Sequence, residues 1–447
     1  MLKLSSDYLI ENELSEVVRL FFDLDNTDVS IDCFFGDSAP YIVVNGEFYH
    51  INLIGRPNEK KFSRLCKSEL YRVLSAYTGK TFSWGALTGV RPTKLGYEIA
   101  ASGEDIVDGL MAYGVSKQKA RLVMSVINSQ KGFSKSLKKI NFYVHIPFCT
   151  TRCNYCSFVS LPAGKNQKLI EEYVQYLVKE IECGVKTLMD GGYEVDSIYI
   201  GGGTPTALNE EQLSAVLDAI PYNNIEYTVE AGRPDTITKD KLDIMLNHGV
   251  TRISINPQSF SDKTLAAIGR AHTADDIVNI YRMAQGRFDI NMDLIAGLTG
   301  ETIQDFEHTL NKAIELRPEN ITVHTLARKN GSIIKVENQA ITTGTSEMVD
   351  LAYKLLTENG YEPYYLYRQK NMLDNLENIG YTLPGKICAN NITTMEEFYS
   401  VFACGAGAIS KRLLDGGRIE RHANLRDVKL YIEQFDERLA KKTKFFL

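Results

Sequence analysis

Hydrophobic and polar residues follow two different patterns along this chain of 447 residues, and the change falls near residue 140. Beyond that point, short runs rich in β-branched and aromatic residues alternate with longer stretches whose apolar residues recur at helical spacing. The predicted strands are 140–145, 195–200, 226–230, 252–256, 289–294 and 320–325. Helices are predicted between them, including 166–189, 210–219, 239–247 and 301–316. This alternation predicts an α/β fold with a parallel sheet and right-handed crossovers, and six such units make a partial (β/α)6 barrel.

The residues before the barrel show a mixed pattern of strands and helices. Strands are predicted at 28–35 and 41–53, and Asn45-Gly46 inside the second range is a hairpin signal. A helix is predicted over 60–77, and Ser116 is the expected N-cap of another helix. These elements predict an α+β unit that is distinct from the barrel.

The length of the chain fits two or three domains. A polar stretch at 129–139 is the expected linker between the first two, and the strand–helix alternation fades after about residue 335. We therefore predict an N-terminal accessory α+β domain at 1–138 and a core barrel at 139–335. A C-terminal region at 336–447 is predicted to cover the barrel mouth, which lies at the carboxyl ends of the strands.

Composition and charge narrow the function classes. Apolar residues make up 44% of the chain and charged residues 24%, as in an ordinary soluble globular protein. A formal net charge of −6 argues against a nucleic-acid-binding surface. No apolar run approaches the length of a membrane span, so we expect a cytoplasmic protein without one.

Three cysteines directly after the first barrel strand are the strongest chemical signal. Cys149, Cys153 and Cys156 have the spacing C-x₃-C-x₂-C. Three thiolates can bind three irons of a [4Fe-4S] cluster and leave the remaining iron without a protein ligand. An open metal position indicates chemistry rather than structure. Its usual ligand is S-adenosylmethionine (SAM), so the spacing predicts a radical SAM protein.

A zinc site or a disulfide is the alternative explanation of these cysteines. A zinc site needs a further ligand, but the one nearby histidine is His145, and no H-x₃-H or second C-x₂-C occurs. A disulfide suits a secreted protein, whereas we expect no signal peptide here. The remaining cysteines stand singly and are expected to be buried thiols, with a redox role left open for the last two: Cys33, Cys66, Cys183, Cys388 and Cys404.

The second barrel strand runs into a glycine-rich loop, Gly201-Gly-Gly-Thr-Pro-Thr206. Glycine lets the backbone approach a ligand closely, and its bare N–H and C=O groups can bind a charged head group. A tight strand-to-helix turn would use glycine as well. No Gly-Lys-Ser/Thr follows, which argues against a phosphate loop. Because this loop lies at the same barrel end as the cysteines, a ligand contact is favoured.

Polar residues also follow the later barrel strands. Glu230 ends the third strand, Gln258 follows the fourth and Asp293 ends the fifth. Polar groups at the carboxyl ends of barrel strands are typical of active sites. The ammonium, sulfonium and ribose hydroxyls of SAM are groups that carboxylates bind. Arg270 could pair with a carboxylate or be a solvated helix-end residue, and Asp293 could instead be a turn or N-cap residue.

Several of these segments together resemble a known family. Tyr143-Val-His-Ile-Pro-Phe-Cys149, the glycine-rich loop and Asp293-Leu-Ile-Ala-Gly-Leu298 resemble the oxygen-independent coproporphyrinogen III oxidase family. Leu87-Thr-Gly-Val-Arg-Pro-Thr-Lys-Leu95 and Tyr365-Leu-Tyr-Arg-Gln-Lys370 resemble its HemZ branch. The first set covers roughly residues 140–330, and the second extends the resemblance towards both ends of the chain.

The resemblance implies residue roles. Cys149, Cys153 and Cys156 would bind the cluster. The contacts to SAM would come from residues of the strand ends and loops: Tyr143, Gly202, Gly203, Thr204, Glu230, Gln258, Arg270 and Asp293. The implied partners are a tetrapyrrole substrate or haem and an electron donor for the cluster.

The resemblance also implies a reaction. In that family the reduced cluster cleaves SAM to methionine and a 5′-deoxyadenosyl radical, which removes a hydrogen from the β-carbon of a propionate side chain. Loss of CO₂ and one electron then leaves a vinyl group. Repeating the reaction converts coproporphyrinogen III to protoporphyrinogen IX in haem biosynthesis. The resemblance therefore implies an oxidoreductase that holds the SAM-derived C5′ atom against the propionate and excludes water and oxygen.

One residue departs from the pattern of the decarboxylases. Those enzymes read C-x₃-C-x₂-C-x-C, whereas this chain has Phe158 at the last position. Phenylalanine at that place also occurs in the haem chaperones of the family. The alternatives are therefore a haem-binding chaperone without decarboxylase activity, or a radical SAM enzyme that opens the haem macrocycle.

Two basic segments leave their roles open. Arg368 and Lys370 in the run 364–370 could bind tetrapyrrole propionates, or the run could be an edge strand with solvent-facing charges. Arg91 and Lys94 could form a partner or substrate patch, or could simply be solvated.

Overall fold

The structure is a computed structural model that describes residues 2–8, 10–23, 27–36, 39–53, 59–89, 91–157, 160–327, 344–369 and 372–447. The chain divides into two compact units. The first contains Met1–Asn128 and Leu366–Glu377, and the second contains Ser129–Tyr365 and Asn378–Leu447. Residues 366–377 therefore belong with the N-terminal elements, which the sequence pattern did not indicate. The predicted domain boundaries near residues 138 and 335 stay predictions.

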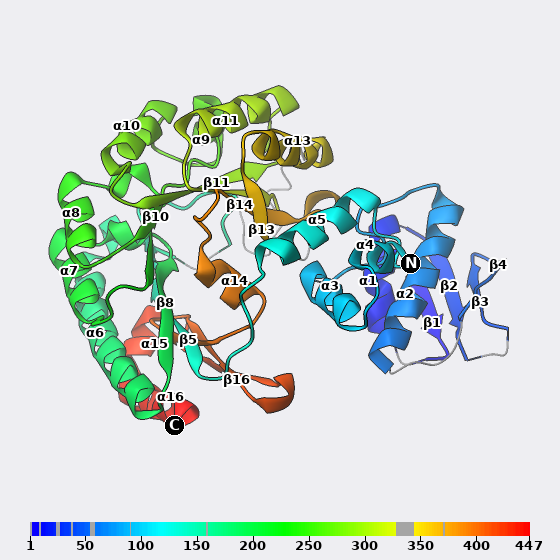
Figure 1. Cartoon of the computed structure of the whole chain (residues 1–447), viewed down its shortest axis with the longest axis horizontal. Helices are drawn as coiled ribbons and strands as arrows, with labels where there is room; N and C mark the ends of the chain where they lie inside the picture. Colours follow the sequence, from blue (N-terminus) through cyan, green and yellow to red (C-terminus); the bar gives the residue numbers. More distant parts are fainter. Residues whose placement is uncertain are drawn as a thin grey trace. The chain divides into compact units, whose positions relative to one another are not determined.

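The second unit is built on a parallel sheet of six strands, which confirms the predicted partial barrel (Figure 1). In spatial order the strands are β5 (Lys139–Ile146), β8 (Glu194–Gly202), β9 (Glu226–Glu230), β10 (Arg252–Ser254), β11 (Asp289–Ala296) and β12 (Asn320–Thr325). Each pairs in parallel with its neighbour. All the carboxyl ends therefore meet at one edge of the sheet, where barrel enzymes carry their active sites.

Helices cover the outer face of this curved sheet (Figure 1). They are α6 (Gln167–Asp190), α7 (Glu210–Asp218), α8 (Lys239–Asn247), α9 (Asp262–Ala267), α10 (Ala274–Ala284) and α11 (Ile303–Leu316). Capping boxes fix the starts of three of them, with Asn209, Thr273 and Thr302 as the N-caps. Within the described residues, no helix is long and apolar enough to cross a membrane.

The C-terminal residues extend the sheet at both of its edges. Strands β14 (Asn378–Thr382) and β13 (Glu362–Tyr367) follow β12, and β15 (Ser400–Cys404), β16 (Ile409–Leu413) and β17 (Ile419–Ala423) follow β5. The helices of this region are α13 (Thr345–Glu358), α14 (Ala389–Met395), α15 (Val428–Glu433) and α16 (Phe435–Phe446). These strands pair the backbone groups that β5 and β12 would otherwise leave open. A covering of the barrel mouth by this region stays a prediction.

A buried carboxylate connects the C-terminal segments to the barrel. Glu180 of α6 accepts hydrogen bonds from Lys442 (2.9 Å), Asn424 (2.8 Å), the Tyr431 hydroxyl (2.7 Å) and the Gly405 N–H (2.6 Å). Burial alone would raise the pKa of Glu180, but the Lys442 charge and these hydrogen bonds lower it. The ion pair Glu180–Lys442 therefore holds α16 against the barrel.

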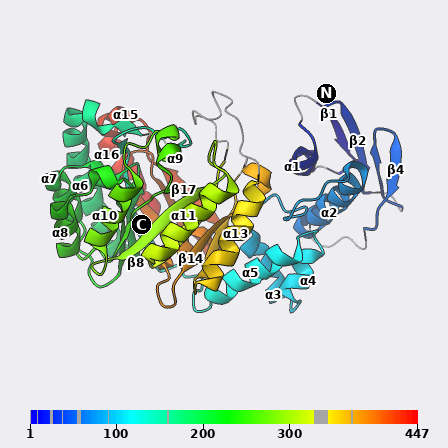
Figure 2. The ribbon, with the colours of Figure 1, turned by 90° about the horizontal axis from the view of Figure 1, so that it is seen from above.

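The first unit begins with a four-stranded sheet in the order β1 (Leu2–Ser6), β2 (Val29–Phe34), β3 (Tyr41–Val44) and β4 (Glu47–His50). The predicted hairpin forms at Asn45 and Gly46, whose φ angles of 49° and 88° suit a tight turn. Helices α1 (Glu11–Phe21) and α2 (Glu59–Thr78) pack against the strands, as seen from above in Figure 2. Three further helices follow: α3 (Pro92–Ala101), α4 (Ile106–Met111) and α5 (Lys117–Ser129).

The late segment 366–377 is held to the first unit by buried polar contacts. Glu377 binds the Nζ atom of Lys119 (2.7 Å) and the indole N–H of Trp84 (2.6 Å). Arg368 is 3% exposed, lies over the Trp84 ring and donates to the carbonyls of Leu87 and Asn375. Arg368 is therefore a buried structural residue whose donors bind backbone carbonyls, and it is not a solvent-facing charge. The predicted edge strand is confirmed, because β13 is the last strand at one side of its sheet. Lys370 lies outside the described residues.

Candidate functional site

The cysteine loop follows β5 and is tied down by a short ladder. Strand β6 (Phe148–Cys149) pairs in parallel with β7 (Leu161–Pro162). Beyond Cys149, the Asn154 N–H and side-chain amide donate to the carbonyls of Ile268 (3.1 Å) and Ala267 (2.8 Å). These hydrogen bonds anchor the loop to the end of α9.

Two buried arginines, Arg233 and Arg270, donate hydrogen bonds to residues of this loop. Arg233 donates to the Cys153 sulfur (3.6 Å) and to the Thr151 hydroxyl (2.9 Å). Arg270 donates to the Tyr155 hydroxyl (2.9 Å) and to the carbonyls of Gly232 and Asn256. Arg270 is 8% exposed, so it is not a solvated helix-end residue, and its Nε atom has no hydrogen-bond partner among the described residues. Its pairing with a carboxylate stays a prediction. Both guanidinium groups place positive charge beside the cysteines.

The residues around the thiols suit an iron–sulfur cluster. Cys149, Cys153 and Cys156 are free thiols, and the Thr204 hydroxyl donates to the Cys149 sulfur (3.5 Å). A Cβ atom at Gly203 would lie 2.4 Å from the Phe148 carbonyl oxygen and 3.0 Å from the Cys149 sulfur. Only glycine therefore fits there. In the described parts of the chain, no group of three or more His, Cys, Asp or Glu side chains is already gathered around a metal position. The soft thiolates and the N–H and O–H donors on their sulfurs fit the chemistry of a cluster.

A row of polar side chains begins beside the glycine-rich loop. The Tyr143 and Tyr199 rings stack with centroids 6.2 Å apart, and the Tyr199 hydroxyl donates to Glu230 (2.7 Å). The Gly202 N–H also donates to the Glu230 carboxylate (3.2 Å). Tyr143 and Tyr199 alternate with buried apolar neighbours along their strands, so these side chains share the inner face of the barrel.

Glu230 carries a perturbed carboxyl group. Burial raises the pKa of Glu230 to about 7, and the neighbouring Asp293 charge adds to the effect, while Tyr199 and Gly202 oppose it. Nearby His145 is neutral at physiological pH, because burial lowers its pKa to about 4. Burial makes ionisation of Glu230 unfavourable, and a bound cation would stabilise the carboxylate.

Asp293 lies within β11 rather than at its end, three residues before the strand stops at Ala296. It accepts a hydrogen bond from the Asn291 amide (2.8 Å) and lies 3.6 Å from His324. Burial alone would raise the pKa of Asp293, but His324 and Asn291 lower it. Asp293 is therefore held ionised inside the barrel, and it is not a turn or N-cap residue.

Gln258 combines a strained backbone with an unsatisfied side chain. Its φ angle of 66° lies in the left-handed region, which non-glycine residues rarely adopt. Main-chain hydrogen bonds to Asp293 (2.9 Å) and Ile295 (3.1 Å) hold it there. The side chain is 6% exposed, and its Oε1 atom has no hydrogen-bond partner among the described residues. Strain and an unpartnered buried oxygen together are typical of a ligand site.

The predicted residues therefore fall into two groups, with Gln258 apart from both. Tyr143, Gly202, Glu230 and Asp293 meet at the inner face, whereas Gly203, Thr204 and Arg270 border the cysteine loop and Gln258 lies beside β11. Cys33, Cys66, Cys388 and Cys404 are buried, and burial raises the pKa of each of these thiols. Such thiols are inert. Cys183 is partly buried, and Phe158 lies outside the described residues.

Sequence reasoning missed several residues of the site. They are Tyr199, Arg233, Asn256, Asn291 and His324. Tyr199, Asn291 and His324 are polar or amphipathic residues at alternate positions of otherwise buried strands, a signal that the period-2 pattern contains. Arg233 and Asn256 follow β9 and β10 at the carboxyl edge of the sheet. Their position after a barrel strand is the same signal that indicated Glu230 and Gln258.

Comparison with known proteins identifies the family. The model of the Radical SAM superfamily matches residues 143–313. The oxygen-independent coproporphyrinogen-III oxidase-like protein HemZ of Bacillus subtilis is 38% identical over 394 residues, which are 83% of this chain and 79% of the relative. This chain belongs to the HemZ family. Radical SAM proteins use a [4Fe-4S] cluster and SAM, which are thus the cofactors of this HemZ-family chain.

Two further likenesses concern function and fold. The heme chaperone HemW of Haemophilus influenzae is 28% identical to this HemZ-family chain over 307 residues, 66% of the chain and 76% of the relative. The structure of the coproporphyrinogen III oxidase HemN of Escherichia coli, a radical SAM enzyme, matches with a TM-score of 0.55 and 22% identity. That match covers 72% of this chain and 73% of the other, and at this identity it shows a shared fold. The predicted radical SAM fold is therefore confirmed.

Proposed function

We propose that this chain is a radical SAM oxidoreductase that decarboxylates the propionate side chains of coproporphyrinogen III to vinyl groups. The observation that carries the enzymatic half of this proposal is that two acidic side chains, Glu230 and Asp293, lie inside the barrel, and that the glycine-rich loop bound to Glu230 also contacts Cys149. The substrate half is supported by the name of the HemZ relative, an oxygen-independent coproporphyrinogen-III oxidase-like protein.

The side chains divide the work between the two cofactors. Cys149, Cys153 and Cys156 bind the cluster, and Arg233 and Arg270 orient the loop that carries them. The bound cluster and SAM supply the one-electron chemistry that removes a hydrogen atom from the substrate. The protein holds that substrate in place and keeps water and oxygen away from it.

The inner face of the barrel provides the groups for SAM. Glu230 accepts the ammonium, because a nearby cation lowers the energy of its ionised form. The backbone of Gly202 and Gly203, together with Tyr143 and Thr204, would hold the amino-acid part of SAM. Asp293 would accept hydrogen bonds from the ribose hydroxyls, and the Oε1 atom of Gln258, which has no partner among the described residues, would accept one from a further donor of the ligand.

An anaerobic turnover assay tests the proposal. Protein with a reconstituted cluster is mixed with SAM, a reductant and coproporphyrinogen III. We expect 5′-deoxyadenosine together with the divinyl product, identified by mass. Deoxyadenosine without porphyrinogen turnover would overturn the substrate assignment and leave the radical SAM chemistry standing. A product with an opened macrocycle from haem would assign a different substrate.

A haem chaperone is the second candidate. It is favoured by the 28% identity with the heme chaperone HemW and by Phe158 at the position where the decarboxylases have cysteine. Stoichiometric haem binding and transfer to an acceptor haem protein, with no decarboxylation in the same preparation, would support it. Decarboxylation at a steady rate without bound haem would exclude it.

A further inference from the structure

The segment that follows β9 brings a buried arginine to one of the three cysteines. Arg233 is 4% exposed, and its Nη1 atom donates a hydrogen bond to the Cys153 sulfur at 3.6 Å. The backbone of Arg233 is extended, with φ −124° and ψ 105°, and the next residue is Pro234. The proline ring disfavours the helical conformation for the residue before it. The local sequence therefore favours the conformation that brings this side chain to the cysteine loop.

The turn after Arg233 is fixed to the end of the glycine-rich loop. The N–H and the hydroxyl of Thr236 donate to the Arg233 carbonyl at 2.9 Å and 2.7 Å. The hydroxyls of Thr236 and Thr206 are 2.6 Å apart. The Nζ atom of Lys241 donates to the carbonyls of Thr206 (2.8 Å) and Thr236 (3.2 Å). These hydrogen bonds hold the backbone of Arg233 in place relative to the loop that contacts Cys149.

A carboxylate orients the guanidinium group. Asp235 accepts from the Nε atom (3.0 Å) and the Nη2 atom (3.4 Å) of Arg233. The same Nη2 atom donates to the Thr151 hydroxyl (2.9 Å), and the Thr150 hydroxyl donates to Asp235 (3.0 Å). Both threonines belong to the cysteine loop. The ion pair therefore holds the loop, and the remaining guanidinium nitrogen, Nη1, is the one that contacts Cys153.

The sulfurs of Cys149 and Cys153 accept hydrogen bonds of different kinds. The donor to Cys149 is the neutral hydroxyl of Thr204, whereas the donor to Cys153 is the charged guanidinium of Arg233. Charge-assisted hydrogen bonds are roughly twice as strong as neutral ones. Reduction adds one negative charge to the cluster and its thiolates, and a buried positive charge beside them is only weakly screened. Such a charge stabilises the reduced form more than the oxidised form, and hydrogen bonds to the sulfurs help to set the potential of a cluster.

We propose that Arg233 is a positioning residue whose charge at the Cys153 sulfur raises the reduction potential of the cluster, so that an electron donor reduces it more readily. Asp235 binds the other nitrogens of the guanidinium, so it keeps Nη1 at the sulfur and offsets part of the charge. The inference depends on the cluster that the family carries and on no particular substrate. Failure of coproporphyrinogen turnover would therefore leave it standing.

A redox titration of the full-length protein with a freshly reconstituted cluster tests this proposal. Dithionite is the reductant, SAM and substrate are omitted, and the electron paramagnetic resonance signal of the reduced cluster is followed against the applied potential. In Arg233→Gln we expect the equilibrium constant for one-electron reduction to fall at least about tenfold, which lowers the potential by about 59 mV. A potential in Arg233→Gln equal to that of the wild-type protein, or higher, would overturn the proposal.

Two further variants separate charge from packing. Asp235→Asn keeps an oxygen acceptor for Arg233 but removes the opposing charge, so the equilibrium constant for reduction should rise, by about threefold or more. This variant also decides the question if Arg233→Gln binds too little iron to be titrated. A lower potential in Asp235→Asn would show that packing sets the potential, and would contradict the proposal.

The matched control is Arg152→Gln, which removes an exposed guanidinium from the same loop. Solvent screens that charge, so the equilibrium constant should stay within about twofold of the wild-type value. An equal fall in Arg152→Gln and Arg233→Gln would mean that any positive charge of the loop acts in the same way. That result would overturn the specific role of the buried arginine.

Discussion

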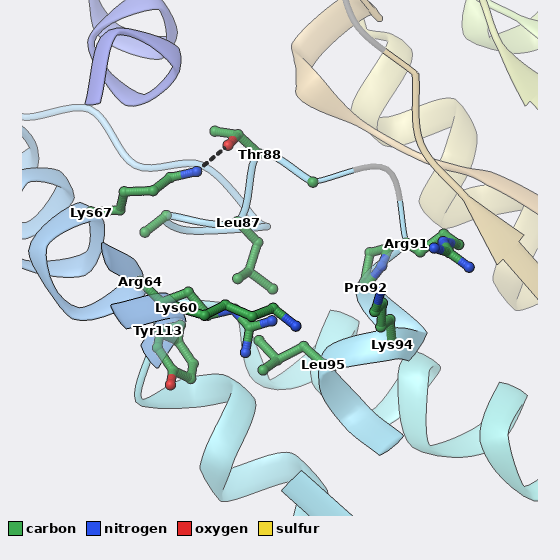
Figure 3. Close-up of a pocket in the computed structure, with 12 residues that line it drawn as sticks. Lys60, Arg64, Lys67, Leu87, Thr88, Arg91, Pro92, Lys94, Leu95 and Tyr113 are labelled. Carbon is green, nitrogen blue, oxygen red and sulfur yellow. Dashed lines mark hydrogen bonds between the residues drawn. The ribbon is translucent and has the colours of Figure 1, made fainter. Parts of the chain in front are cut away.

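The barrel and the N-terminal unit each gather ionisable side chains, but of opposite sign. In the barrel, burial and the Asp293 charge raise the pKa of Glu230, and His324 lowers the pKa of both carboxyl groups. In the first unit, five basic residues and no acidic residue line one pocket (Figure 3): Lys60, Arg64, Lys67, Arg91 and Lys94. The overall charge of −6 describes neither place. Local charge is set by residues of the strands in one case and by a helix face in the other, and the net charge of the chain does not reveal either.

The two units are alike in how they hold distant segments. A buried lysine–glutamate pair closes each of them: Glu180–Lys442 in the second and Lys119–Glu377 in the first. In these pairs every charge has an opposite charge at about 3 Å. Removing one partner of such a pair would leave the other charge buried and uncompensated, so each pair fixes the segments that carry it.

The largest effect is expected from the variant Cys153→Ala. It removes one of three thiolates, so the reconstituted protein should lose its brown chromophore and its SAM cleavage, with iron falling from about four per chain to well below one. Iron analysis and the visible spectrum measure this. Cys183→Ala, outside the loop, should keep the full cluster. An intact cubane cluster in Cys153→Ala would refute the assignment of the ligands.

The next largest effect is expected from Lys442, which forms a buried ion pair, in contrast to its neighbour Lys441, which forms an exposed one. Lys442→Met should lower the free energy of unfolding by about 3–5 kcal/mol, because it leaves Glu180 buried and without its cation. Lys441→Ala breaks only an exposed pair with Glu437 and should cost at most about 0.5 kcal/mol. Urea unfolding of the two variants measures the difference. Similar costs would show that the buried pair does not hold the unit together.

Glu230→Gln separates the acidic site from the rest of the barrel. With the charge removed, we expect SAM affinity to fall by about 10–100-fold, while Glu211→Gln on the exposed side of α7 has no effect. Binding to the wild-type protein should strengthen as the pH rises through about 7, where Glu230 ionises, and this rise should disappear in the variant. Isothermal calorimetry at several pH values tests both expectations. An unchanged pH profile in the variant would assign the titration to another group.

The raised pKa of Glu230 also predicts how the stability of the protein without ligand depends on pH. This pKa is about 7 in the folded protein against an ordinary value of 4.5, so the folded state holds the proton more tightly. The contribution of Glu230 is therefore fully present below about pH 4.5 and is lost as the pH rises through about 7. Relative to wild type, Glu230→Gln should gain on the order of 3 kcal/mol in unfolding free energy between about pH 5 and about pH 8. A pH-independent difference in urea unfolding would contradict this.

The smallest effect is expected from replacing Arg233, which contacts the cysteine loop. Arg233→Gln removes the guanidinium that donates to the Cys153 sulfur, and cluster retention or activity should fall by about 10–100-fold at most. Arg233→Lys keeps the charge but not the shared contacts to Thr151 and Asp235, and should lie between the variant and wild type. Iron release to a chelator measures retention. Complete cluster loss in Arg233→Lys would mean that the arginine folds the loop rather than tunes it.

The strand pattern predicted most of the barrel correctly. All six strands were placed within about three residues of their observed ends, and their carboxyl ends meet as the alternation required. β1 and α1 were missed, because a short strand paired with a distant one and an isolated helix give weak local signals. The edge strands β15–β17 were missed for the same reason.

The sequence by itself determined the three thiols, the strand ends that carry Glu230 and Gln258, and the family, because each of these is a local pattern of residue types and spacings. Only the tertiary structure decided that Arg270 holds the cysteine loop, that Arg368 is buried over Trp84 and that residues 366–377 return to the first unit. It also decided that Arg91 and Lys94 line the same cavity as three basic residues of α2. Those outcomes depend on contacts between segments far apart in the chain, and a local pattern carries no information about which distant group a charge will meet.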